Sequence, residues 1–148
     1  MNYCEYNMNL FNVPNGYYFA HCISADFRMG AGIAVEFVNR FDMRRILHSK
    51  YPRYLDCYIN NKLIGDCILD GKVLNLITKE RYYHKPTYNS LKLALMHMKK
   101  LCIDNGIKYV AMPKIGCGLD KLEWSIVTKI IQDIFEDTDI TIAVCYIK

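Results

Sequence analysis

Two glycine-containing loops constrain what this chain can fold into more than any other feature of its sequence. They span residues 28–34 and 114–120, and each contains two glycines. Each follows a short apolar run and precedes a segment with helical spacing, which predicts two strand–loop–helix units. Since glycine has no Cβ, such loops can press backbone N–H groups against a ligand, and the helix beyond adds a positive dipole end. Although a lone glycine pair is often only a turn, the two loops together predict a cleft for a diphosphate.

Strand-like and helix-like segments alternate along the rest of the chain. Apolar and β-branched runs predict strands at 17–23, 107–112 and 140–147, and a hairpin of 66–69 with 72–77 around Asp70-Gly71. Apolar spacing predicts helices at 32–41, 42–51 and 124–135, and a further helix that begins after Thr87 and ends at Asn105-Gly106. The polar segment 78–88 is predicted to be a loop. This order predicts a three-layer α/β/α sandwich with a central mixed β-sheet, whose ligands bind beyond the carboxyl ends of the strands.

The length of 148 residues suits one domain, which we expect to span 1–148. No apolar run reaches the ~18 residues that cross a bilayer, and the first ten residues lack the pattern of a signal peptide. We therefore expect a cytoplasmic protein, or a nuclear one in a eukaryote, that does not associate with membranes. We also expect a monomer.

Charge and cysteine usage exclude several classes of protein. The net charge of +4 suits an anionic ligand but is too small and dispersed to indicate nucleic acid by itself. The seven cysteines are odd in number and form no C-x-x-C pair, which argues against a disulfide framework and a zinc site. We expect most of them to be buried thiols in a reducing compartment. Cys117 lies inside the second loop, but no histidine near it in sequence would activate it as a nucleophile.

Three polar residues are candidates for chemistry. Lys79 directly follows an apolar strand; it is either a solvated end-of-strand residue or an amine that attacks a sugar carbon behaving as a masked aldehyde. Asp120 ends the second loop; it either caps the next helix or acts as a general acid or base. His21, inside a predicted strand, is more typical of a core residue than of a catalyst. His84 is expected to be a loop residue that helps to fix the Lys79 segment.

Four blocks in this order resemble the macrodomain family. They are Ala20-His21-Cys22-Ile23-Ser24, Arg28-Met29-Gly30-Ala31-Gly32-Ile33-Ala34, Leu76-Ile77-Thr78-Lys79 with His84-Lys85-Pro86-Thr87-Tyr88, and Met112-Pro113-Lys114-Ile115-Gly116-Cys117-Gly118-Leu119-Asp120. The likeness runs from about Leu10 to Ile147. Within the family, the blocks look most like glycohydrolases that remove terminal ADP-ribose from proteins and deacetylate O-acetyl-ADP-ribose.

The resemblance implies ADP-ribose as the ligand and a role for each matching position. Lys79 would attack the anomeric carbon of the distal ribose, and Asp120 would assist ring opening and proton transfer. The two loops would hold the diphosphate and distal ribose, and Leu10 would contribute its backbone to the adenine pocket beside Asn9. The full set of implied ligand-binding residues is Asn9, Leu10, His21, Ser24, Met29, Gly30, Gly32, Ile33, Ala34, Lys114, Ile115, Gly116, Cys117, Gly118, Leu119 and Ile147.

Two segments depart from the family pattern. The family usually has Gly-Asp before the position of Leu10, where the aspartate binds the adenine amino group, whereas this chain has Met8-Asn9. An asparagine oxygen can accept that hydrogen bond without a charge, so we expect weaker adenine binding and a less strict base preference. The segment 48–61 also differs from the family in length or construction.

The resemblance therefore implies a hydrolase that removes ADP-ribose from acidic side chains of proteins, or deacetylates O-acetyl-ADP-ribose, without a metal or redox cofactor. Two alternatives remain open at this point. One is a module that binds ADP-ribose without hydrolysing it, which need not keep both Lys79 and Asp120. The other is a hydrolase of ADP-ribosylated DNA or RNA bases, whose activity should be sensitive to salt.

Overall fold

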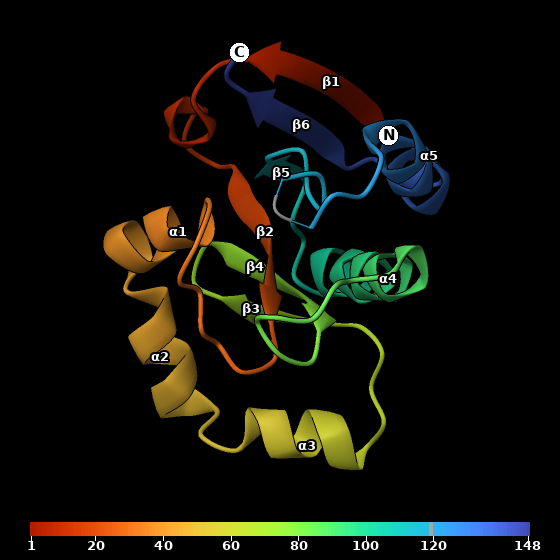
Figure 1. Ribbon diagram of the computed structural model, residues 1–148. Coiled ribbons are helices and arrows are strands. Elements are labelled where there is room, and N and C mark those ends of the chain that lie inside the picture. The colour runs from red at the N-terminus through yellow and green to blue at the C-terminus, as the bar shows by residue number, and fades with distance from the viewer. Residues whose placement is uncertain (119) are drawn as a thin grey trace.

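A mixed β-sheet runs through the centre of the molecule (Figure 1). The computed structural model describes residues 1–118 and 120–148. Within these residues, the sheet has six strands in the order β1-β6-β5-β2-β4-β3. Their bounds are β1 Asn2–Asn7, β2 Tyr18–Ser24, β3 Asp66–Asp70, β4 Val73–Lys79, β5 Tyr109–Met112 and β6 Thr141–Tyr146. Neighbouring strands are parallel except β3 and β4, which form an antiparallel hairpin. The mixed sheet of the sequence analysis is confirmed.

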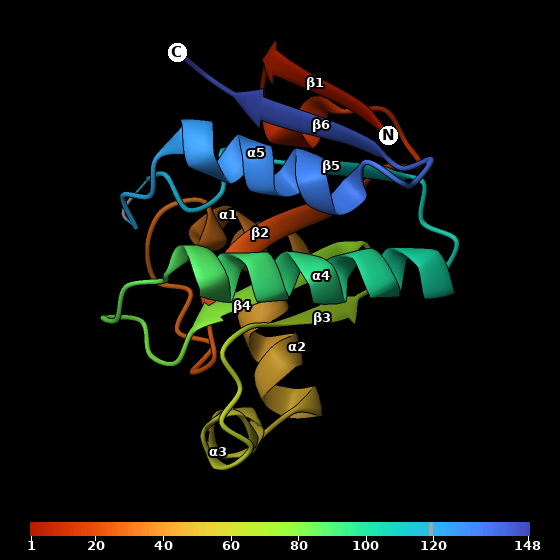
Figure 2. The ribbon, with the colours of Figure 1, turned by 90° about the vertical axis from the view of Figure 1, so that its right-hand side faces the viewer.

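Helices cover both faces of this sheet, as Figures 1 and 2 show. Helices α4 (Tyr88–Asp104) and α5 (Trp124–Phe135) lie on one face, and α1 (Ala34–Phe41) and α2 (Met43–Lys50) lie on the other. The core accordingly has two layers: side chains such as Leu95 and Val127 pack on the first face, and Phe37 and Leu47 pack on the second. Burial of apolar surface on both sides of the sheet makes the predicted three-layer sandwich.

The local signals in the sequence correspond to the observed elements. The hairpin closes around Asp70-Gly71, with Asp70 opposite Val73. Thr87 caps α4, since its hydroxyl accepts a hydrogen bond from the Ser90 N–H at 3.0 Å while the Ser90 hydroxyl accepts from the Thr87 N–H at 2.9 Å. One boundary was wrong: 78–88 is not entirely a loop, because Thr78 and Lys79 continue β4.

Three elements lie where the sequence analysis predicted none: β1, the 3₁₀ turn Leu10–Asn12, and α3 (Tyr54–Asn60). Strand β1 is at the edge of the sheet and most of its residues are exposed, so it lacks the apolar signal of a buried strand. Helix α3 lies in the segment 48–61, which departs from the family pattern. It packs through Tyr54, whose ring stacks on Phe27 at 5.2 Å between centroids.

All seven cysteines are free thiols. Cys67, Cys102 and Cys145 are buried, Cys22 and Cys117 are partly buried, and Cys4 and Cys57 lie at the surface. Fewer than half are therefore buried, and the expectation that most of them are was wrong. In the part of the chain that the structure describes, no helix has the length and apolar character needed to cross a membrane.

Candidate functional site

A cavity of about 530 Å³ opens where β2, β4 and β5 end. Both glycine loops form its walls, and the residues after β4 complete it. Its lining consists of Cys22, Ile23, Ser24, residues 28–34, Lys79, Tyr82, His84, Lys85, Pro113, Lys114, Ile115, Gly116, Gly118 and Asp120. A cavity of this size, at the carboxyl ends of parallel strands, suits a small organic ligand.

The first loop is held in shape by its backbone conformation and by one arginine. Met29 and Gly32 both have positive φ, at 48° and 62°, which turns the chain sharply between β2 and α1. The Arg44 guanidinium of α2 donates hydrogen bonds to the carbonyl oxygens of Arg28 and Met29, both at 2.8 Å. Ile33 and Ala34, at the start of α1, line the cavity, and no side chain caps this helix. The first turn of α1 is thus placed to meet an anion.

The second loop depends on a glycine that a larger residue could not replace without movement. Gly116 has a φ of 75°, and a Cβ there would lie 2.9 Å from Leu122 Cδ1. Its carbonyl oxygen accepts a hydrogen bond from the Leu122 N–H at 2.7 Å, which closes the loop. Helix α5 begins only at Trp124, and the described residues 121–123 do not line the cavity. The positive end of this helix is therefore not part of the cavity wall, contrary to the prediction.

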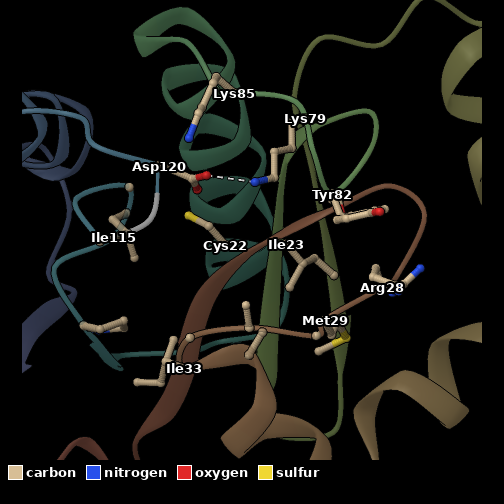
Figure 3. A pocket seen from close by; sticks show the side chains of 18 of the residues that line it. Cys22, Ile23, Arg28, Met29, Ile33, Lys79, Tyr82, Lys85, Ile115 and Asp120 are labelled. Carbon is tan, nitrogen blue, oxygen red and sulfur yellow. Dashed lines mark hydrogen bonds and ion pairs between the residues drawn. The ribbon is translucent and has the colours of Figure 1, made fainter.

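Lys79 and Asp120 meet inside the cavity (Figure 3). The Lys79 Nζ donates a hydrogen bond to Asp120 Oδ1 at 2.8 Å, and the two side chains are only 15% and 18% exposed. Lys79 comes from the end of β4 and Asp120 from the second loop, so the sheet brings together residues that are 41 positions apart. The N-cap of α5 is Glu123, so Asp120 is not the cap of this helix.

A thiol lies beside this ion pair. Cys22 lines the same cavity, and Figure 3 shows its side chain near Asp120. Burial, reinforced by the Asp120 carboxylate, raises the pKa of the Cys22 thiol far above its ordinary value. Burial also raises the pKa of Cys117, whose Sγ donates to the carbonyl oxygen of Ile115 at 3.4 Å. Both side chains are therefore neutral thiols at physiological pH, which makes them poor nucleophiles.

The structure places most of the implied ligand-binding residues in the cavity wall. Those that line it are Ser24, Met29, Gly30, Gly32, Ile33, Ala34, Lys114, Ile115, Gly116 and Gly118. Those that the structure describes elsewhere are Asn9, Leu10, His21, Cys117 and Ile147. Leu119 was also implied, but it lies outside the described residues.

Each residue outside the lining has a different environment. His21 is fully buried: its Nε2 hydrogen-bonds to Asn75 Oδ1 at 2.7 Å and its ring stacks on Phe37, so it is a core residue and cannot touch a ligand. Leu10 is buried in the core layer beneath α1 and α2. The Asn9 oxygen accepts a hydrogen bond from the Phe11 N–H at 2.9 Å and caps the 3₁₀ turn. Ile147 is 71% exposed near the C-terminus.

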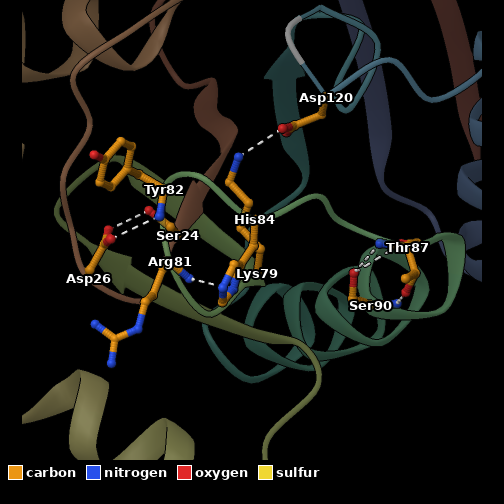
Figure 4. Close-up of polar contacts among 9 residues, drawn as sticks. All are labelled: Ser24, Asp26, Lys79, Arg81, Tyr82, His84, Thr87, Ser90 and Asp120. Atoms are coloured by element: carbon orange, nitrogen blue, oxygen red, sulfur yellow. Dashed lines mark hydrogen bonds and ion pairs between the residues drawn. The ribbon is translucent and has the colours of Figure 1, made fainter.

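Several lining residues were not predicted as ligand-binding, notably Tyr82 and Lys85 in the segment between β4 and α4. Their closeness to Lys79 in sequence was the available signal. In this segment the Arg81 N–H donates to His84 Nδ1 at 3.3 Å, as Figure 4 shows, so His84 helps to shape the loop after Lys79. This contact agrees with the expectation for His84.

Comparison with known proteins gives one matching family model and several relatives. The model, "Macro domain", matches residues 71–131. The chain is 42% identical over 137 residues to ADP-ribose glycohydrolase OARD1 of Homo sapiens and of Bos taurus, which covers 92% of this chain and 86% of each relative.

Solved structures share the fold at low sequence identity. The macrodomain of Mycobacterium tuberculosis DarG has a TM-score of 0.81 at 19% identity, over 99% of this chain and 97% of that one. Thermosipho africanus DarTG in complex with ADP-ribose has a TM-score of 0.71 at 18% identity, over 98% of this chain and 41% of that one.

Proposed function

We propose that this chain, which belongs to the macrodomain family, is an ADP-ribosyl hydrolase that cleaves the bond between ADP-ribose and an acceptor carboxylate. Relatives 42% identical over most of their length are named ADP-ribose glycohydrolases. The cavity is large enough for the distal ribose and diphosphate, and loops with positive-φ glycines form two of its walls.

The observation that carries this proposal is the ion pair of Lys79 and Asp120. A module that only binds ADP-ribose needs backbone N–H groups and shape, but it has no need for an amine and a carboxylate 2.8 Å apart inside the cavity. A partly buried amine beside a proton acceptor is the arrangement that covalent catalysis by lysine requires.

In the proposed reaction, the Lys79 amine is the nucleophile. Asp120 first takes a proton from the Lys79 ammonium across their hydrogen bond, which leaves a neutral amine. The amine then attacks the anomeric carbon of the distal ribose. A C–N bond forms as the C–O bond to the acceptor breaks, and the acceptor leaves as a carboxylate.

Water then completes the cycle. It attacks the same carbon, the C–N bond breaks, and the Lys79 nitrogen takes back the proton that Asp120 held. The net reaction consumes one water and releases ADP-ribose, the acceptor carboxylate and one proton. O-acetyl-ADP-ribose that carries its acetyl group on the anomeric oxygen is an ester of the same kind, so we propose that it is also a substrate and that its acetyl group leaves as acetate.

Substitution of Lys79 tests this mechanism. We expect Lys79→Ala to reduce the release of ADP-ribose from a glutamate-modified protein to the uncatalysed level, while calorimetry still detects ADP-ribose binding. Lys100→Ala, which removes an exposed lysine of α4, is the matched control and should leave the rate unchanged. Full activity of Lys79→Ala would show that Lys79 is not the nucleophile. If the unmodified protein binds ADP-ribose without any turnover, the chain is a reader.

Asp120→Asn tests the proton acceptor separately. The amide keeps the size of the side chain but cannot take the lysine proton, so we expect kcat to fall about 10²-fold or more. Steady-state kinetics at saturating substrate measure this effect. An unchanged rate would leave Asp120 with a structural role only.

A further inference from the structure

The Asp26 carboxylate joins the two segments that carry the cavity wall and Lys79 (Figure 4). Its Oδ1 accepts hydrogen bonds from the Ser24 hydroxyl at 2.5 Å and the Arg28 N–H at 3.0 Å. Its Oδ2 accepts from the Tyr82 N–H at 2.8 Å, which is 56 positions away in the sequence. Ser24 thus ends β2 and Arg28 lies in the segment between β2 and α1, whereas Tyr82 lies in the segment between β4 and α4.

This junction lies where the regular pairing of the sheet breaks down. The register between β2 and β4 shifts between Ile23 and Ser24, so that Ser24 lies opposite Lys79. Beyond the shift, the Ala25 N–H donates to the Lys79 carbonyl oxygen at 2.9 Å. A bulge of this kind interrupts the hydrogen-bond ladder and redirects the side chains near it. Lys79 is the last residue of its strand, so contacts beyond the strand must hold its backbone.

Asp26 supplies such a contact without lining the cavity itself. Its bond to the Tyr82 N–H holds the chain, three residues after Lys79, against the loop that follows β2. This loop lines the cavity through Arg28 and Met29. The Arg28 guanidinium lies over the Tyr82 ring at 4.7 Å from its centroid and adds a second link between the same segments.

We propose that Asp26 is a positioning residue for the Lys79 amine. By tying the two segments together, it fixes the distance between the Lys79 nitrogen and the sugar that the first loop holds. This role rests on the proposed function, because it concerns the rate of the Lys79 step. Small errors in the position of a reacting group have large effects on rate.

Three donors require a carboxylate at this position. An aspartate is acceptor-only, with two oxygens, whereas an asparagine must turn its NH₂ group toward at least one of the donors. We therefore expect Asp26→Asn to break the bond to the Tyr82 N–H or the bonds to Ser24 and Arg28, with little change in side-chain volume.

The first experiment measures kcat, the Kd for ADP-ribose and amide hydrogen exchange in Asp26→Asn. We expect kcat to fall by about tenfold or more and Kd to change by less than about threefold. We also expect faster exchange of the Tyr82 or the Arg28 amide, whichever loses its bond to the asparagine. Asp133→Asn, at an exposed position of α5, is the matched control and should match the unmodified protein in all three. A kcat within twofold of the unmodified protein overturns the proposal. So does a fall in kcat matched by an equal loss of ADP-ribose affinity.

A second pair of variants tests the Tyr82 amide and does not depend on how well Asp26→Asn folds. The His84 N–H donates to the Arg81 carbonyl oxygen at 3.0 Å, which makes Tyr82 the second residue of a turn, where proline is favoured. Tyr82→Pro removes the N–H that Asp26 accepts, whereas Tyr82→Ala keeps it and removes only the ring. We expect kcat of Tyr82→Pro to be at least fivefold below that of Tyr82→Ala, and equal values overturn the proposal. Absence of turnover in the unmodified protein would instead overturn the proposed function.

Discussion

His21 shows how a titratable side chain can serve the packing of this protein. The imidazole has no exposed surface, and its only hydrogen bond among the described residues is that of Nε2 to the Asn75 side-chain oxygen. Burial lowers its pKa from the ordinary value of 6.5 to about 4, although the bond to Asn75 opposes the shift. The ring is therefore neutral in the folded protein at pH 7, and it stacks on Phe37 as an aromatic core residue would.

This shift predicts a loss of stability in mild acid. The unfolded chain binds a proton at His21 as the pH falls below 6.5, whereas the folded protein binds it only near pH 4. The contribution of neutral His21 to the free energy of unfolding is fully present above pH 6.5 and is lost as the pH falls toward 4. The loss amounts to about 2 kcal/mol between pH 7.5 and 5. Urea unfolding of the unmodified protein and of His21→Gln at both pH values measures it. An equal pH dependence in the two proteins would contradict the shift.

At the scale of elements, helix α4 supports the side of the sheet that carries Lys79. It packs on β3 and β4 and begins with the Thr87 capping box, just after the loop that lines the cavity. The segment before β3 approaches this helix closely at Gly65. A Cβ at Gly65 would lie 2.3 Å from the Ser90 carbonyl oxygen and 2.9 Å from the Ala94 backbone nitrogen. Because both atoms belong to the helix backbone, they cannot move aside easily.

We therefore expect Gly65→Ala to displace the β3 segment from α4 and to lower the free energy of unfolding by about 1–3 kcal/mol. Thermal or urea unfolding measures the change. Gly118→Ala is the control, since a Cβ there meets no atom within 4 Å. If Gly65→Ala were as stable as the control, this result would contradict the close approach of the segment before β3 to α4.

At the scale of the whole molecule, the cavity depends on segments that only the complete sheet brings together. Its lining comes from the ends of β2 and β4 and from the residues that follow β2, β4 and β5. These strands are neighbours in the sheet although they are far apart in the chain. Unfolding separates these segments, so we expect the unfolded chain to have no comparable site for a ligand.

This dependence predicts that ADP-ribose stabilises the fold. At 100 times its Kd, a ligand that binds only the folded state raises the free energy of unfolding by about 2.7 kcal/mol. We expect this increase with ADP-ribose, and a smaller one with AMP at the same concentration, since AMP lacks the distal ribose and one phosphate. Unfolding in urea with each ligand measures both effects. Equal stabilisation by AMP would mean that the cavity at Lys79 contributes little to binding.

Structural features that depend only on residues close in the sequence were predicted well. The Asp70-Gly71 turn, the Thr87 cap and helix α5 all depend on neighbours in the sequence, and each lies where its pattern indicated. Strand β1 and helix α3 were missed because they depend on distant partners: β1 pairs with β6 at the sheet edge, and α3 packs through Tyr54 on Phe27.

The amino-acid sequence alone was enough to predict the two loops, most of the strands and helices, and the likeness that singled out Lys79 and Asp120. These features follow from backbone preferences and side-chain chemistry that act over a few residues. The three-dimensional structure was needed to establish that Lys79 and Asp120 meet at 2.8 Å, that His21 belongs to the core, and that Asp26 bonds to the Tyr82 N–H. Each of these contacts joins segments distant in the chain, and the packing of the sheet and its two helical layers sets their distances.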